Sequence, residues 1–150
     1  MPSNPQLKLM TDLLDLGGVI VTNYQIIAEV GVVLHLESTE NQATCPCCGS
    51  KSSKLHQNNE LTIRDLPWGE QAVYLKINRR QMRCKKCGKK FSEELSYVRK
   101  KRNYTDRLRN KIIREVLNSD IKNTAEINGL SEQEIETMLK DLGERSEEHT

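Results

Sequence analysis

Aromatic residues are scarce in this chain of 150 residues, which has one tryptophan, one phenylalanine and four tyrosines. Hydrophobic residues make up 36% of the sequence, and no apolar run approaches the roughly 20 residues that a membrane-spanning helix needs. This composition argues against one large core and favours small units stabilised by a metal or a partner. The polar segment Met1–Met10 lacks the apolar core of a secretory signal, so we expect a cytoplasmic protein that does not bind membranes.

Four of the five cysteines form two matching pairs, Cys45 with Cys48 and Cys84 with Cys87. Each pair has two residues between its members and a glycine directly after it. This spacing lets two thiolates reach one metal ion at about 2.3 Å, and two pairs fill the four-ligand shell of a structural Zn2+. The alternatives are redox pairs or disulfides, which the odd number of cysteines and the lack of a secretory signal disfavour. Cys47 is interpreted as a bystander.

The segment between the cysteine pairs is longer than in a usual zinc ribbon, so we expect it to contain a hairpin that returns the second pair to the first. Gln71–Arg83 is the clearest strand, because apolar and polar residues alternate along it. Leu61–Leu66 is predicted as a shorter strand before a turn at Pro67–Gly69, and Asn58-Asn59 as a further turn. His56 is the alternative metal ligand.

The first part of the chain predicts a short helix followed by a β-hairpin. Apolar residues recur at helical spacing in Leu7–Leu16, and Gly17-Gly18 ends the pattern. Val19–Ile27 and Glu29–Glu37 are rich in residues that favour strands. His35 lies within the second strand, where we interpret it as a strand residue and not as a ligand.

The last part of the chain predicts three helices. The first covers about Thr105–Asn118, the second about Ile121–Ile127, and the third starts at Ser131, which forms a capping box with Glu134. A short helix, a turn containing glycine and another helix are typical of a helix-turn-helix. The exposed start of the third helix is acidic, so this helix either reads DNA or contacts another protein.

Charge is distributed unevenly along the chain. Fifteen of the 23 Lys and Arg residues lie between Lys76 and Lys111, alongside three acidic residues. Such a belt beside a structural metal favours a polyanionic partner over a merely solvated face, and we expect that partner to be double-stranded DNA. The candidate phosphate contacts are Lys76, Arg79, Arg80, Arg83, Lys85, Lys86, Lys89, Lys90, Arg99, Lys100, Lys101 and Arg102.

Several motifs occur in a characteristic order. They are Cys45–Ser50 (CPCCGS), Leu55-His56, Arg64–Pro67 (RDLP), Arg79–Cys84, Cys87 and Phe91–Glu93. Together they resemble the N-terminal zinc-finger region of bacterial insertion-sequence transposases of the IS-L-three type. In that family a helix-turn-helix and then a catalytic domain of the DDE type follow the zinc ribbon. The resemblance implies binding to the terminal inverted repeats of a mobile element.

The resemblance does not extend to a catalytic domain, because the acids after Glu115 lie in a helical pattern without strands. We therefore expect a chain that does not catalyse strand transfer itself and that works with a separately encoded catalytic domain or as a homo-oligomer. The alternatives are a stand-alone zinc-ribbon and helix-turn-helix regulator, or an adaptor that binds other proteins.

The predicted fold class is α+β. Residues 1–98 are expected to form a short helix, a β-hairpin and a small antiparallel zinc ribbon. Residues 99–142 are expected to form an all-α helix-turn-helix unit, and residues 143–150 a flexible tail.

Overall fold

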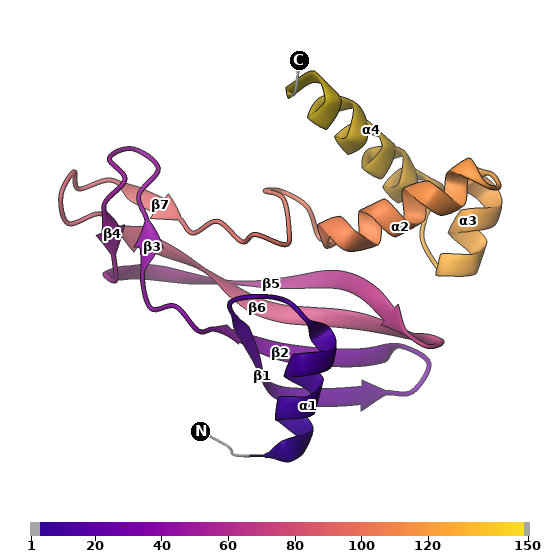
Figure 1. The fold of residues 1–150 in the computed structure, drawn as a ribbon, viewed down its shortest axis with the longest axis horizontal. Coiled ribbons are helices and arrows are strands. Elements are labelled where there is room, and N and C mark those ends of the chain that lie inside the picture. Colours follow the sequence, from indigo (N-terminus) through magenta and orange to yellow (C-terminus); the bar gives the residue numbers. More distant parts are fainter. Residues whose placement is uncertain (1–3, 149–150) are drawn as a thin grey trace. The chain divides into compact units, whose positions relative to one another are not determined.

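The computed structural model describes residues 4–148 and divides the chain into two compact units (Figure 1). The first unit ends at Thr105 and the second begins at Asp106, where the sequence suggested a boundary after residue 98. The boundary falls later because the backbone of residues 103–105 pairs with a strand of the first unit. None of the helices in the described residues is both long and apolar enough to cross a lipid bilayer.

The first unit is built on one mixed sheet. Its strands are β1 (Val19–Ile27), β2 (Gly31–Ser38), β5 (Leu55–Trp68), β6 (Gln71–Arg83) and β7 (Lys90–Ser92). They lie in the order β1-β2-β6-β5, and β7 pairs with the end of β6. The predicted hairpin and the strands between the cysteine pairs thus share one sheet, joined by a parallel pairing of β2 with β6 that the sequence pattern did not reveal. Two short strands, β3 (Ala43–Thr44) and β4 (Lys51–Ser52), pair separately.

Helix α1 (Pro5–Leu14) covers one face of this sheet (Figure 1). Asn4 caps its start by accepting a hydrogen bond from the Gln6 amide at 2.8 Å. Its buried Leu7 and Leu14 pack with strand residues such as Leu34 and Leu75, the last two of which are fully buried. The helix ends before the predicted Leu16 because Asp15 takes a left-handed conformation.

Strand β5 is much longer than the predicted Leu61–Leu66. Asn58 and Asn59, which the sequence suggested as a turn, lie within β5 opposite Arg80 and Arg79 of β6. Their turn tendency is overridden because β6 provides a continuous row of backbone partners. The hairpin turns at Gly69, whose φ is 62°, between the paired Trp68 and Gln71, within one residue of the turn predicted at Pro67–Gly69.

Gly31 allows the close approach of β2 to β6. Its φ is +136°, and a Cβ at this position would lie 2.3 Å from the carbonyl oxygen of Ala72. We expect Gly31→Ala to reduce the free energy of unfolding by about 2–3 kcal/mol, because alanine is strained at this φ and its methyl group would collide with the backbone of Ala72. Gly17→Ala is the control, since nothing lies within 4 Å of its added methyl group. Equal denaturation midpoints for the two variants would contradict this account.

The second unit contains α2 (Asp106–Leu117), α3 (Ile121–Asn128) and α4 (Glu132–Glu148). Its core is made of Leu108, Ile112, Ile113, Ala125, Ile135 and Met138. The predicted capping box is confirmed: the Glu134 amide donates to Ser131 Oγ and the Ser131 amide to Glu134 Oε1, both at 3.1 Å. Helix α4 continues through Gly143 to Glu148, where the sequence suggested a tail, because Glu and Arg favour helix and one glycine costs only about 1 kcal/mol. Residues 149–150 of that tail lie outside the described residues.

A polar cluster joins α2 to α3. Lys111 Nζ donates to Glu115 Oε1 at 2.8 Å, and Asn128 Nδ2 donates to Glu115 Oε2 at 2.8 Å. Burial acts to raise the pKa of Glu115, but these two hydrogen bonds and the positive charge of Lys111 lower it below its usual value. The carboxylate therefore remains charged and holds the first two helices of this unit together.

Candidate metal centre and nucleic-acid interface

The two cysteine pairs adopt the same local backbone conformation. In each, the amide of the first cysteine donates to the carbonyl five residues later at 2.8 Å, and the amide of the glycine donates back to the first cysteine's carbonyl at 2.9 Å. Gly49 and Gly88 have φ of 75° and 77°, a conformation that favours glycine. These hydrogen bonds join Cys45 to Ser50, Gly49 to Cys45, Cys84 to Lys89, and Gly88 to Cys84. The glycine after each pair is therefore needed to complete each turn.

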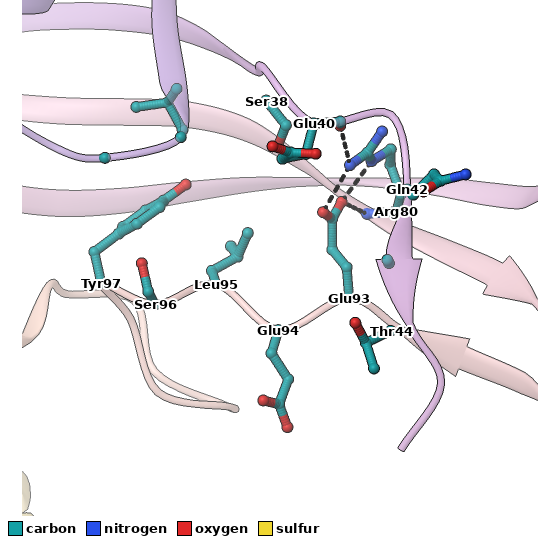
Figure 2. Close-up of a pocket in the computed structure, with 14 residues that line it drawn as sticks. Ser38, Glu40, Gln42, Thr44, Arg80, Glu93, Glu94, Leu95, Ser96 and Tyr97 are labelled. Carbon is teal, nitrogen blue, oxygen red and sulfur yellow. Dashed lines mark hydrogen bonds and ion pairs between the residues drawn. The ribbon is translucent and has the colours of Figure 1, made fainter. Parts of the chain in front are cut away.

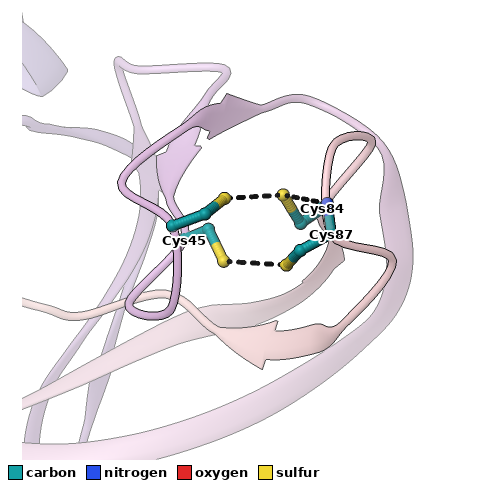
Figure 3. A group of neighbouring side chains, drawn as sticks. Cys45, Cys84 and Cys87 are labelled. Carbon is teal, nitrogen blue, oxygen red and sulfur yellow. Dashed lines mark hydrogen bonds between the residues drawn. The ribbon is translucent and has the colours of Figure 1, made fainter.

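The four paired sulfurs converge on one point (Figure 3). All four Sγ atoms lie within 4.8 Å of one another, with 3.6 Å between Cys45 and Cys87 and 3.4 Å between Cys48 and Cys84. A tetrahedral shell with Zn–S bonds of about 2.3 Å has sulfurs about 3.8 Å apart, so this group fits one Zn2+. Four protein ligands leave no open position, which makes the zinc structural. Cys47 is exposed and lies outside the group.

The pKa values of these thiols differ widely. Hydrogen bonds from Ser50 lower the pKa of Cys48 to about 6. For Cys87 the backbone hydrogen bond from Lys89 acts to lower the pKa, but burial and the neighbouring thiols Cys45, Cys84 and Cys48 raise it to about 12. Four thiolates this close repel one another unless a cation shares them, and Zn2+ binding supplies that cation and releases their protons.

Apolar side chains support the inner half of the centre. Cys45 and Cys84 are each 1% exposed and pack with Met82 and Phe91. The other two ligands, Cys48 and Cys87, are exposed. The centre thus has a buried side that joins the sheet and an open side that faces solvent.

Hydrogen bonds also attach the first cysteine pair to the end of β6. The Ser52 hydroxyl donates to the Arg83 carbonyl at 2.6 Å, and the Arg83 amide donates to the Lys54 carbonyl at 2.9 Å. Because β6 leads directly into Cys84, these bonds and the metal fix the two pairs to the same strand.

Comparison with known proteins gives two matches to domains of one transposase family. Residues 41–87 match the zinc finger of transposases of the IS204/IS1001/IS1096/IS1165 group, and residues 93–143 match the helix-turn-helix domain of transposase family ISL3. Two successive segments of the chain are thus similar to the zinc ribbon and the helix-turn-helix domain of ISL3 transposases. The cysteine group and the helices α2–α4 are the structural counterparts of these two domains.

A curated transposase is also similar to this chain. The chain is 27% identical over 107 residues to the transposase for insertion sequence element IS1001 of Bordetella parapertussis. The match covers 71% of this chain and 26% of that protein, so the chain spans about a quarter of the relative's length. No solved structure matches the chain significantly.

The basic residues selected from the sequence fall into three groups in the structure. The first surrounds the second cysteine pair, where four lysines are exposed and Arg83 is half-buried with its Nη1 3.4 Å from the Gly88 carbonyl. We call this group the knuckle surface; its members are Arg83, Lys85, Lys86, Lys89 and Lys90. The zinc centre holds this surface in place, because Cys84 and Cys87 lie within the same stretch of chain.

The second basic group is the loop Arg99–Arg102, which the structure holds at both ends. Val98 is buried in the core before it, and Tyr104 is buried after it. The Arg64 amide donates to the Asn103 carbonyl at 2.8 Å, and the Thr105 amide donates to the Arg64 carbonyl at 2.9 Å. The Thr105 hydroxyl adds a 2.7 Å bond to the buried Asp65. Residues 99–102 thus form a short basic loop attached to the edge of the sheet.

The third group, on β6, has intramolecular contacts. Arg80 donates from Nε to Glu93 Oε2 at 2.8 Å and from Nη2 to Oε1 at 3.0 Å, and Glu93 is 8% exposed. This hydrogen bonding to Glu93 raises the pKa of Arg80 above its usual value. Arg79 is half-buried, and Lys76 lies 4.0 Å from Glu60 in an exposed pair that contributes little. The structure therefore gives Arg80 a role in attaching β7 to β6.

His35 and Arg64 lie on the same face of the sheet as Lys76. Strand pairing places His35 and Thr62 on either side of Lys76, and Arg64 beside Tyr74, with the guanidinium 5.9 Å from the ring centre. We did not select Arg64 or His35 as site residues from the sequence. The signal that identifies them is the register of β2, β6 and β5, which only the pairing of the strands provides.

Proposed function

We propose that this chain binds double-stranded DNA at the ends of an insertion sequence, with the knuckle surface as its main phosphate contact. The observation that carries the proposal is the density of positive charge beside a structural metal. Five Lys and Arg residues lie between Arg83 and Lys90, with no acidic residue among them, and the four lysines are exposed. The match to transposase domains supports the choice of DNA as the polyanion.

Zinc explains why this surface suits phosphate binding. A flexible lysine cluster loses conformational entropy when it binds, whereas the knuckle backbone is already held by two sulfur ligands and two hydrogen bonds. Each phosphate that a lysine neutralises releases condensed counterions, so affinity depends steeply on salt. The loop Arg99–Arg102, held at both ends, is the second contact in this proposal.

The helix-turn-helix unit is proposed to select the DNA sequence. Its second helix α3 ends at Gly129, whose φ is 64°, and α4 starts after a short turn, as in domains that place one helix in the major groove. The exposed start of α4 carries Glu132, Gln133 and Glu136. Glutamine can pair with adenine and glutamate can accept from cytosine N4, but the carboxylates oppose contact with phosphates. We therefore expect α4 to contact the edges of the bases and not the phosphates.

We further propose that these domains bind DNA without catalysing strand transfer. In the described residues, the four cysteines are the one group of three or more His, Cys, Asp or Glu side chains found close enough to share a metal. In this proposal a catalytic domain that acts together with these domains carries out strand transfer. That catalytic domain is encoded separately, or the chain acts as a homo-oligomer.

The experiment that tests this function compares two DNA duplexes. Zinc-loaded protein is titrated with a duplex carrying the terminal inverted repeat of the element and with a scrambled duplex, across a series of salt concentrations. We expect a steep negative slope of log K against log salt for both, and tighter binding to the repeat by at least about tenfold, or 1.4 kcal/mol. Equal affinity for both duplexes would favour a general nucleic-acid binder, and no binding at low salt would favour a protein adaptor.

A further inference from the structure

A cavity of about 350 Å³ lies in the first unit, and its lining includes none of the cysteine ligands and none of the knuckle surface. Four parts of the chain line it: Gly17–Val19 after α1, the loop from Ser38 to Thr44, Arg80 of β6, and Glu93–Tyr97 after β7 (Figure 2). Neither the zinc site nor the proposed DNA contacts use these walls, apart from Arg80. The cavity is therefore a separate feature of the fold.

Tyr97 places an unpaired hydroxyl in this cavity. The residue is 8% exposed, and its oxygen is buried without a hydrogen-bond partner in the part of the chain that the structure describes. Figure 2 shows the hydroxyl end of the side chain directed into the cavity, toward the side where Ser38 and Glu40 lie. A buried hydroxyl without a partner costs about 1–3 kcal/mol, which a bound ligand can recover.

The charged groups that face the cavity have a net negative charge. Arg80 and Glu93 form a bidentate pair and neutralise each other. Arg80 Nη2 also donates to the backbone carbonyl of Glu40 at 2.8 Å, which holds the Glu40 loop at the rim. In Figure 2 the carboxylate of Glu94 points away from Ser38, Glu40 and Tyr97. Glu40 therefore provides the uncompensated negative charge at the rim of the cavity.

We propose that this cavity binds a primary ammonium group. An ammonium has three N–H donors and no acceptor, and the cavity offers three matching acceptors in the Glu40 carboxylate, the Ser38 hydroxyl and the Tyr97 hydroxyl. Burial and the negative charge of Glu93 raise the pKa of Tyr97, so its hydroxyl remains neutral and keeps its lone pairs for an N–H donor. The ammonium belongs either to a free polyamine or to a lysine side chain of another protein.

The test is a titration of the zinc-loaded full chain with butylammonium, followed by the amide NMR signals of Gly17, Gly18 and Ser96. Tetramethylammonium is the control cation, because it has the same charge but no N–H donor. We expect saturable shifts with butylammonium that tetramethylammonium does not reproduce. Equal shifts with both cations, or none up to a large excess of butylammonium, would overturn the proposal.

Three variants locate the site. Tyr97→Phe should weaken butylammonium binding about three- to tenfold, the effect of one hydrogen bond. Without ligand, this variant should be at least as stable as the parent, because the ring remains in the core and an unpaired buried hydroxyl is removed. Glu40→Gln should weaken binding at least as much. Glu94→Gln is the matched control, since its exposed carboxylate points away in Figure 2, and it should bind as the parent does. If Glu94→Gln weakens binding as much as Glu40→Gln, surface charge alone attracts the cation and the proposal fails.

A last comparison distinguishes the two sources of the ammonium. Spermidine and a blocked lysine peptide are titrated against the same signals. Tighter binding of spermidine assigns the site to a polyamine, and tighter binding of the peptide assigns it to a protein side chain. Failure of both in a chain that still binds DNA would overturn this inference and leave the proposed function intact.

Discussion

Replacement of Cys45 or Cys87 with serine is expected to release about one Zn2+ per chain and to unfold the zinc ribbon. Structural zinc sites bind with about 10–16 kcal/mol at neutral pH, so one of four ligands contributes about 3 kcal/mol, or a loss of zinc affinity on the order of 100-fold. The two variants should differ, because Cys45 is buried with Met82 and Phe91 whereas Cys87 is exposed. A hydroxyl buried at position 45 adds a desolvation cost, so Cys45→Ser should be the less stable protein.

Cys47→Ser is the control for this prediction. Its sulfur lies outside the group of four, although the residue is next to a ligand in the chain. Bound zinc is measured by metal analysis after gel filtration, and the ribbon by its denaturation curve with and without a chelator. Equal zinc loss in Cys47→Ser and Cys45→Ser would show that the ligand set is different from Cys45, Cys48, Cys84 and Cys87.

Neutralising three lysines of the knuckle surface is expected to weaken DNA binding and to reduce its salt dependence. The variant Lys85→Gln, Lys86→Gln, Lys89→Gln removes three exposed charges without touching a zinc ligand. Each lost phosphate contact makes the negative slope of log K against log salt shallower by about 0.9. The magnitude of the slope should therefore decrease by up to about 2.7. Affinity for inverted-repeat and scrambled duplexes should fall by similar factors, because phosphate contacts carry no sequence information.

The matched control lowers the net charge by the same amount elsewhere in the first unit. Lys8, Lys51 and Lys54 are also exposed, and Lys51 and Lys54 follow the first cysteine pair, so their replacement by glutamine tests whether the two sides of the zinc ribbon are equivalent. We expect a smaller change in slope than in the knuckle variant. Similar slopes for the two variants would mean that general charge, and not the knuckle surface, attracts the DNA.

The role of Arg80 shows how the structure separates basic residues that the sequence groups together. By spacing, Arg80 belongs to the basic face of β6 with Lys76. In the fold, its guanidinium forms an ion pair with Glu93, and its side chain is only 19% exposed. The exposed lysines of the knuckle surface are therefore better placed than Arg80 to bind phosphate. A charged pair held this closely is costly to open, because each partner would be left poorly solvated.

Local patterns in the sequence were sufficient for the zinc ligands and for the presence and order of the helices, although not for the ends of α1 and α4. The CxxC spacing identifies Cys45, Cys48, Cys84 and Cys87, because two thiolates on one tight turn can reach the same metal ion. The alternation of residues predicts β6 at its observed bounds, and the capping box predicts the start of α4. In each case the determining contacts lie within a few residues of one another along the chain.

Tertiary structure alone decided the features that join distant parts of the chain. Three features bring together segments that are far apart in the sequence. They are the parallel pairing of β2 with β6, the ion pair between Arg80 and Glu93, and the cavity beside Tyr97. Such pairings depend on register and on competition among many possible partners, which periodicity within one segment does not encode. The sequence by itself determined a zinc ribbon followed by a helical unit, and the fold decided which of its charged residues remain available to bind a partner.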